Sequence, residues 1–301
     1  ALVWNSAGTL AFVAGMGSNN LVVLDASGTR VGSPLTLGEG PTGIALDEAR
    51  AQLYVLNKFD STISVVSTFS QSEVARVRFF DPSPTAIKHG RKHLYDTHET
   101  SGTGIVSCAS CHPDARTDRL AWDLGNPAGD ELPRDEQFLQ GGTGSGELPW
   151  HPLKGPLLTQ TLQDIIGKEP FHWRGDRDGL EDFNGTFETL LGDDEQLTTV
   201  EMQEFEDFLA TIWLPPNPFR ALDNSLPTSL VLTGHYSTGT FSPAGTPLPN
   251  GNAVSGKAIF RPPNVQDFEG ACSSCHALPT TLGSEFDVVA GEFVQFPKGS
   301  D

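Results

Sequence analysis

The sequence predicts a multidomain α+β protein in which β-sheet repeats precede two mainly helical lobes. Three observations predict this class: an internal repeat of strand-like runs near the N-terminus, later segments with apolar residues at helical spacing, and a length of 301 residues, enough for about two ordinary domains. The formal net charge of −19 argues against nucleic acid as a partner. No apolar run reaches the length that a membrane span requires.

The N-terminal repeat aligns without gaps at an offset of 42 residues. Its first copy contains strand-like runs at residues 11–14 and 21–24, and its second copy contains runs at 53–56 and 63–66. A period in the low forties with short strands is typical of β-propeller blades, and the repeat resembles the YVTN-type β-propeller family. Two blades cannot close a ring, so we expect an incomplete propeller whose open flanks are covered by blades before Ala1 or by another chain. Hairpins of a β-sandwich are the alternative.

All four cysteines belong to two Cys-x-x-Cys-His motifs. Two thiols on one helical turn can form thioethers with both vinyl groups of one haem, and the imidazole that follows can ligate its iron. We therefore expect two covalently bound haem c groups, and hence a periplasmic, extracellular or cell-surface protein. The attachment residues would be Cys108, Cys111, Cys272 and Cys275, and the iron ligands would be His112 and His276. A zinc site and a redox-active dithiol are the alternatives.

Further segments lie in a recognisable order around these motifs. They are residues 94–112 with Thr117 and Asp118, and residues 151–162, 171–177, 206–212, 217–219 and 256–260. Over about residues 90–280 they resemble the bacterial di-haem cytochrome c peroxidase/MauG superfamily. The resemblance implies two mainly α-helical cytochrome c lobes. We divide the chain into β-propeller blades at 1–85, a first haem domain at 86–215 and a second at 216–301, which we expect to be truncated at its C-terminus.

The sixth iron ligand of the first haem is assigned through this resemblance. The superfamily's distal histidine precedes a Lys-Gly-Pro, which places it at His151, with His172 as the alternative. For the second haem the ligand stays open, because neither histidine nor methionine follows His276. Three other histidines, His89, His93 and His98, lie in a polar run and are expected to be solvated.

Methionine is not expected to ligate either iron. Met202 recurs with Phe205 and Leu209 at helical spacing, after the capping signal Thr198-x-x-Glu201, and this pattern indicates a helix that buries Met202 in the core. If neither haem has a sulfur ligand, the reduction potentials should be low, because an axial methionine raises them.

Several residues between the motifs have two interpretations each. Trp173 matches the superfamily's tryptophan between the two haems, or it is a packed aromatic residue. Arg174 and Arg177 suit haem propionates, or they pair with neighbouring aspartates. Superfamily members often hold calcium between the haem domains, so calcium is a further expected cofactor without assignable ligands.

These features predict a di-haem c-type cytochrome that transfers electrons outside the cytoplasm. Its partner would be a redox protein, foremost another cytochrome, and a homo-oligomer or larger assembly is open. The alternative is a di-haem peroxidase or MauG-like oxidase that uses hydrogen peroxide, which needs an open iron position and a nearby acid-base group. Residues 183–191 do not reproduce the superfamily's Gln and Glu pattern, and Glu188 and Trp173 are the remaining catalytic candidates.

Overall fold

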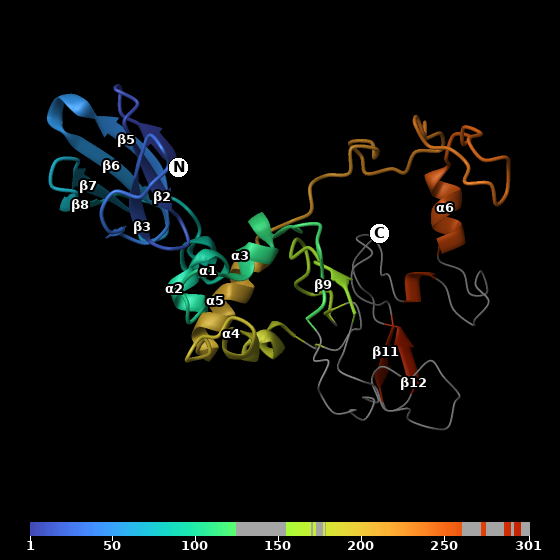
Figure 1. Ribbon diagram of the computed structural model, residues 1–301. Helices are drawn as coiled ribbons and strands as arrows, with labels where there is room; N and C mark the ends of the chain where they lie inside the picture. Colours follow the sequence, from blue (N-terminus) through green and yellow to red (C-terminus); the bar gives the residue numbers. More distant parts are fainter. Residues whose placement is uncertain are drawn as a thin grey trace. The chain divides into compact units, whose positions relative to one another are not determined.

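The computed structural model describes most of the chain in two compact units (Figure 1). The described residues are 1–124, 155–169, 171–172, 177, 179–260, 272–274, 286–289 and 292–295. The first unit comprises Ala1–Arg134, Gly146–Gly167 and Phe171–Trp213, and the second comprises Asp135–Ser145, Lys168–Pro170 and Leu214–Asp301. The three-part division with boundaries at 85 and 215 stays a prediction.

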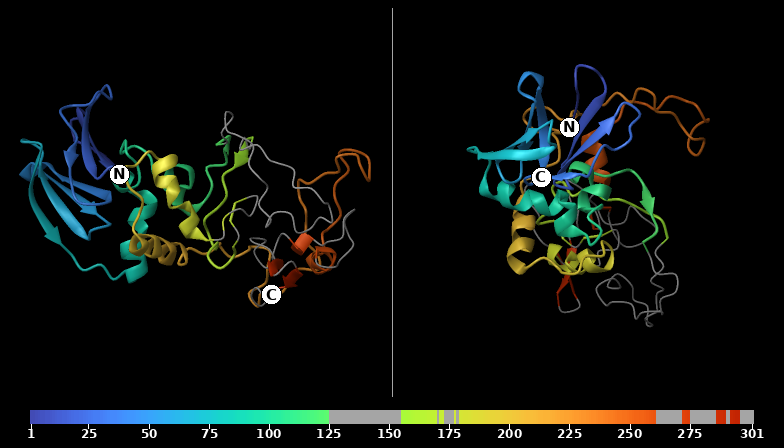
Figure 2. Two further views of the ribbon diagram at one scale, coloured as in Figure 1. Left: turned by 90° about the horizontal axis from the view of Figure 1, so that it is seen from below. Right: turned by 60° about the vertical axis from the view of Figure 1, so that its left-hand side comes forward.

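Two four-stranded antiparallel sheets open the first unit, one for each copy of the repeat (Figures 1 and 2). The strands of the first sheet are β1 (Leu2–Trp4), β2 (Leu10–Gly15), β3 (Asn20–Asp25) and β4 (Leu35–Thr36). Those of the second are β5 (Pro41–Asp47), β6 (Gln52–Asn57), β7 (Thr62–Ser67) and β8 (Ser72–Arg78). In both sheets each strand pairs with the next along the chain, as in a propeller blade. The strand-like runs predicted from the repeat are therefore confirmed.

The two sheets share one apolar core. Side chains alternate between the faces of a strand, and one apolar face of each sheet, formed by β2 and β3 or by β6 and β7, packs against the other sheet. The buried core residues are Phe12, Ala14, Leu21, Val23, Leu37, Leu53, Val55 and Val66. Burial of this surface stabilises the pair of sheets, since a two-stranded or single-sheet piece has too little apolar contact to be stable alone.

Short helices follow the sheets. The α-helices are α1 (Thr85–Tyr95), α2 (Thr97–Thr100), α3 (Cys108–Cys111), α4 (Gly185–Thr189) and α5 (Thr199–Leu209), and the 3-10 helices are η1 (Glu48–Arg50), η2 (Pro113–Ala115) and η4 (Leu180–Phe183). Two short strands, β9 (Ala121–Trp122) and β10 (Leu157–Leu158), pair antiparallel. The described part of the chain is thus mixed α/β, with several antiparallel sheets and few, short helices.

Helices α1 and α5 pack closely because α1 has a glycine at the contact. A Cβ atom on Gly90 would lie 1.9 Å from the carbonyl oxygen of Glu204. Leu94 and Leu209 are fully buried beside it. The predicted start of α5 is confirmed, since Thr198 forms a capping box with Glu201. Met202 is buried, as predicted, together with Phe205 and Phe208.

The expectation that His93 is solvated is wrong. His93 is fully buried, and its Nε2 lies 3.4 Å from Glu204 Oε2 while its Nδ1 lies 3.5 Å from Glu99 Oε2. The physical reason is helical periodicity, since position 93 follows Gly90 by three residues and therefore shares the face that packs on α5. His89 and His98 are exposed as expected, although His89 Nδ1 lies 3.1 Å from Glu204 Oε1.

Hairpin turns from both sheets contact the segment from α1 to α2. In the first sheet, the Gly17 carbonyl accepts a hydrogen bond from the Thr97 N–H at 2.9 Å. In the second, the Lys58 carbonyl accepts a hydrogen bond from Arg91, whose guanidinium carbon also lies 5.5 Å from the centre of the Phe59 ring. These contacts tie the sheets to α1 within one unit.

The second unit contains α6 (Ala253–Phe260), the 3-10 helix η5 (Cys272–Ser274) and the hairpin of β11 (Phe286–Val289) with β12 (Glu292–Gln295). Residues 214–250, rich in Pro, Gly, Ser and Thr, form turns with isolated bridges such as Leu230 with Gly251 and Tyr236 with Pro247.

Candidate functional site

The first Cys-x-x-Cys-His motif forms a single helical turn, α3. The turn begins after Ser107, whose N–H donates to Ser110 Oγ at 3.1 Å while the side chain of Ser107 caps the helix start. Cys108 and Cys111 are partly buried and form no disulfide. One helical turn therefore presents two free thiols, which is the arrangement that attachment to one haem requires.

His112 is held in one orientation at the end of α3. Its backbone N–H donates to the Cys108 carbonyl at 2.9 Å, and its Nδ1 lies 2.9 Å from the carbonyl oxygen of Gln160. A carbonyl only accepts hydrogen bonds, so Nδ1 carries the proton and Nε2 retains its lone pair. Burial lowers the pKa of His112, which also favours the neutral imidazole. This is the form in which histidine ligates a metal.

A second segment brings Gln160 to His112. Residues 155–164 lie antiparallel to residues 115–122, joined by the Leu157–Trp122 and Leu158–Ala121 pairs of β10 and β9. The Leu162 N–H donates to the Ala115 carbonyl at 2.8 Å. Just after His112 and Pro113 the chain turns through left-handed conformations at Asp114 and Ala115, with φ of 52° and 59°. The hydrogen bond to His112 thus depends on a contact across 48 residues of sequence.

The two thiols do not resemble a redox-active dithiol. Burial raises the pKa of Cys108 to about 12, and burial with the neighbouring Asp118 carboxylate raises the pKa of Cys111. The attacking cysteine of a dithiol oxidoreductase instead has a lowered pKa. Within the described ranges no group of three or more His, Cys, Asp or Glu side chains could hold a metal ion. The zinc alternative stays untested, because it needs Cys275, which lies outside those ranges.

Tyr95 connects the second sheet to the segment that follows His112. Its ring stacks on Phe59 with 5.9 Å between centroids, and its hydroxyl donates to Asp114 Oδ1 at 3.3 Å. Burial, reinforced by the negative charge of Asp114, raises the pKa of Tyr95 to about 12. The tyrosine therefore stays protonated and keeps this hydrogen bond over the whole neutral range.

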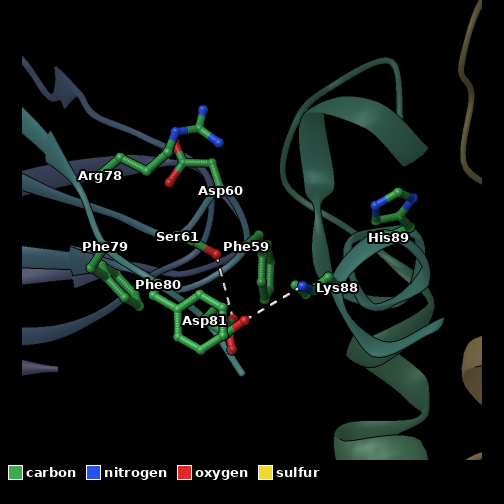
Figure 3. Close-up of a pocket in the computed structure, with 9 residues that line it drawn as sticks. All are labelled: Phe59, Asp60, Ser61, Arg78, Phe79, Phe80, Asp81, Lys88 and His89. Carbon is green, nitrogen blue, oxygen red and sulfur yellow. Dashed lines mark hydrogen bonds between the residues drawn. The ribbon is translucent and has the colours of Figure 1, made fainter. Parts of the chain in front are cut away.

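A pocket of about 410 Å³ opens beside Phe59 (Figure 3). Its lining consists of Phe59, Asp60, Ser61, Arg78, Phe79, Phe80, Asp81, Lys88 and His89. Ser61 Oγ donates to the Asp81 carboxylate at 3.4 Å, and Lys88 Nζ donates to the Asp81 carbonyl at 3.4 Å. Because the lining carries both signs of charge and Asp81 is already paired, we assign no ligand to this pocket.

The remaining predicted site residues fall in different places. His172 has φ of 67° and meets the Phe183 ring edge-on at 4.8 Å between centroids. Arg177 pairs through its backbone with Phe171. Glu188, on α4, is exposed and accepts a hydrogen bond from Gln196 at 2.5 Å. Cys272 begins η5 and is free of disulfides. The other candidates, His151, Trp173, Arg174, Cys275 and His276, lie outside the described residues.

Sequence reasoning missed the contribution of Gln160. Its functional atom is a backbone carbonyl, and any residue type could supply it, so composition and spacing hold no signal for it. The fold alone brings it to His112.

Comparisons with known proteins give weak structural similarities. No family model matches the sequence, and no curated protein is significantly similar to it. Hydrazine synthase of Kuenenia stuttgartiensis is similar at 21% identity over 27% of this chain and 23% of that chain, with a TM-score of 0.26. The same enzyme pressurised with xenon gives 19% identity over 49% of this chain and 43% of that chain, with a TM-score of 0.33.

A third similarity is to the Cps50 (Swd1) β-propeller domain of Myceliophteria thermophila, at 14% identity over 27% of this chain and 25% of that chain, with a TM-score of 0.24. The chain spans less than half the length of each of these structures. Within the described part of the chain, no helix has the length and apolar character needed to cross a bilayer.

Proposed function

We propose that the chain is a di-haem c-type cytochrome that transfers electrons outside the cytoplasm. The first haem would be held by Cys108, Cys111 and His112, and the second by the motif from Cys272 to His276. The observation that carries the proposal is the hydrogen bond from His112 Nδ1 to the Gln160 carbonyl, 2.9 Å long. It fixes the tautomer and leaves Nε2 as a ligand, which is how metal-bound histidines are oriented by their outer partners.

Some residues of the first site would attach the haem covalently, and others would orient the histidine that ligates its iron. Bound haem c supplies an iron that alternates between the ferric and ferrous states. Cys108 and Cys111 supply the two thioether sulfurs from one turn of helix. His112 would supply a nitrogen ligand to the iron, and the Gln160 carbonyl would restrain rotation of the imidazole. Asp114, two residues after His112, accepts a hydrogen bond from Tyr95, which restrains η2.

The finer assignments are part of the same proposal. They comprise two mainly helical cytochrome lobes of the di-haem peroxidase/MauG type, His151 as the distal ligand with His172 as the alternative, a cytochrome as redox partner, and calcium as a further cofactor. His172 is packed edge-on against Phe183.

An electron carrier is preferred to a peroxidase because the acid-base candidate is poorly placed for proton transfer. Glu188 is exposed and is already engaged with Gln196 at 2.5 Å. General acids of this kind are instead found in buried sites. Glu188 therefore fits a surface role.

Haem attachment can be tested by producing the chain in a bacterium that attaches haem c in its periplasm. The intact mass should exceed that of the polypeptide by two haems, and Cys108→Ala with Cys111→Ala should remove one of them. Ser110→Ala, between the two cysteines, is the matched control and should retain both. A colourless protein, or one in which zinc replaces iron at these thiols, contradicts the proposal.

The choice between carrier and enzyme has its own experiment. The oxidised protein should show low-spin, six-coordinate haem and little turnover of hydrogen peroxide, and Glu188→Gln should leave both properties unchanged. Rapid peroxide turnover that depends on Glu188 would establish the alternative instead.

A further inference from the structure

The contact between the two sheets uses different faces of the two repeat copies. The first sheet buries Phe12, Ala14, Leu21 and Val23, which are 3%, 8%, 2% and 6% exposed. An offset of 42 residues relates these positions to Tyr54, Leu56, Ile63 and Val65 in the second sheet, but those four side chains are only half-buried. We call this face, in either sheet, the trailing face. In the first sheet the trailing face is covered, and in the second it is open.

The opposite faces show the reverse pattern. The second sheet buries Leu53, Val55 and Val66, which are 0%, 0% and 1% exposed. The same offset relates them to Ala11, Val13 and Leu24 of the first sheet. We call this the leading face. In the first sheet the small Ala11 is fully buried, but Val13 and Leu24 are only half-buried, and the neighbouring β1 adds Leu2 and Trp4, which are 55% and 44% exposed.

The two open faces are therefore the two kinds of face that already pack together in the core. Within the chain, the trailing face of the first sheet packs on the leading face of the second sheet. The leading face of the first sheet and the trailing face of the second sheet are left uncovered. Val77, paired with Ile63 on the open trailing face, is 57% exposed. Exposed apolar side chains that are neighbours on one sheet face are typical of an interaction site.

We propose that the open leading face of one chain packs on the open trailing face of a second copy. The contact continues the packing between the two sheets and is heterologous, since each partner offers a different face. The charge of the chain does not oppose it, because residues 1–80 hold six acidic and five basic side chains although the whole chain has a net charge of −19. A heterologous contact adds further copies until the ring closes or a filament forms.

The test is the mass of the 301-residue chain in solution, measured by sedimentation and light scattering over a wide concentration range. The average mass of the wild type should rise with concentration above that of a single copy, whose polypeptide alone has a mass of 32.2 kDa. Trp4→Glu blocks the leading face and Val77→Glu blocks the trailing face, so each variant alone should remain monomeric. Phe69→Glu, in the turn between β7 and β8 and 93% exposed, is the matched control and should assemble like the wild type.

Mixing the two blocked variants distinguishes a heterologous contact from a symmetric one. Each variant keeps the face that the other lacks, so an equimolar mixture should form a one-to-one dimer that grows no further. A wild type that stays monomeric, blocked variants that still assemble, or a mixture that does not dimerise would each overturn the proposal. Leu2→Glu and Ala75→Glu replace the first pair if circular dichroism shows that either variant is misfolded.

Discussion

Replacing Gly90 by alanine should destabilise the packing of α1 on α5. The new Cβ would lie 1.9 Å from the Glu204 carbonyl oxygen and 2.5 Å from Phe208 Cβ. The carbonyl contact is with backbone, which cannot rotate away, so the two helices must separate by roughly 1.5 Å to reach an ordinary van der Waals distance. Separation of that size also loosens Leu94 and Leu209, both fully buried.

The expected loss follows from two opposing effects. Overpacking of a closely packed contact costs about 3 kcal/mol, while alanine gains about 1 kcal/mol over glycine within a helix. The free energy of unfolding should therefore fall by about 2 kcal/mol, a change of roughly thirtyfold in the folding equilibrium. In a helix without such a contact the same substitution should be stabilising.

Urea denaturation followed by far-UV circular dichroism measures this loss, and hydrogen exchange of the amides in α1 and α5 locates it. Gly256→Ala in α6 is the matched control, because nothing lies within 4 Å of its new Cβ. That variant should be as stable as the wild type or up to about 1 kcal/mol more stable. If Gly90→Ala behaves like Gly256→Ala, the close approach of the helices is not as described.

Three further predictions concern titration and capping. Tyr95, with its pKa raised to about 12, should stay protonated at pH 11, as measured by ultraviolet absorbance. Its contribution to stability should decline as the pH rises from about 10, where tyrosine ionises in the unfolded chain, to about 12. Ionisation of Tyr95 near pH 10 would refute the contact with Asp114. Hydrogen bonds from Ser83, together with those from Arg91 and Lys58, hold the pKa of Asp81 well below its usual range. Asp81→Asn should therefore be less stable than the wild type at pH 7, and this difference should shrink as the pH falls below about 4. A difference in denaturation midpoint that does not change with pH would contradict this prediction. Thr198→Ala should cost about 1 kcal/mol through loss of the α5 cap, and Thr198→Ser, which restores the hydroxyl, should recover it.

Local sequence patterns were sufficient to predict those strands and helix starts whose signal lies within a few residues. The repeat at an offset of 42 residues predicted strands that form two separate sheets, and Thr198 with Glu201 predicted the start of α5. Both signals rest on short-range physics: side-chain alternation along a strand and capping of the first helical turn. His93 shows where a prediction from neighbouring residues fails. Its polar neighbours suggested solvent, whereas its position three residues after Gly90 places it under α5.

The amino-acid sequence by itself determined the two Cys-x-x-Cys-His motifs, and with them the residue types and spacing of the proposed haem attachment, because thioether chemistry depends on neighbours along the chain. Only the tertiary structure decided which carbonyl orients His112, which helix covers His93 and which sheet faces stay open. Each of these depends on segments distant in sequence, such as residues 112 and 160, which approach only after the chain has packed its apolar surfaces.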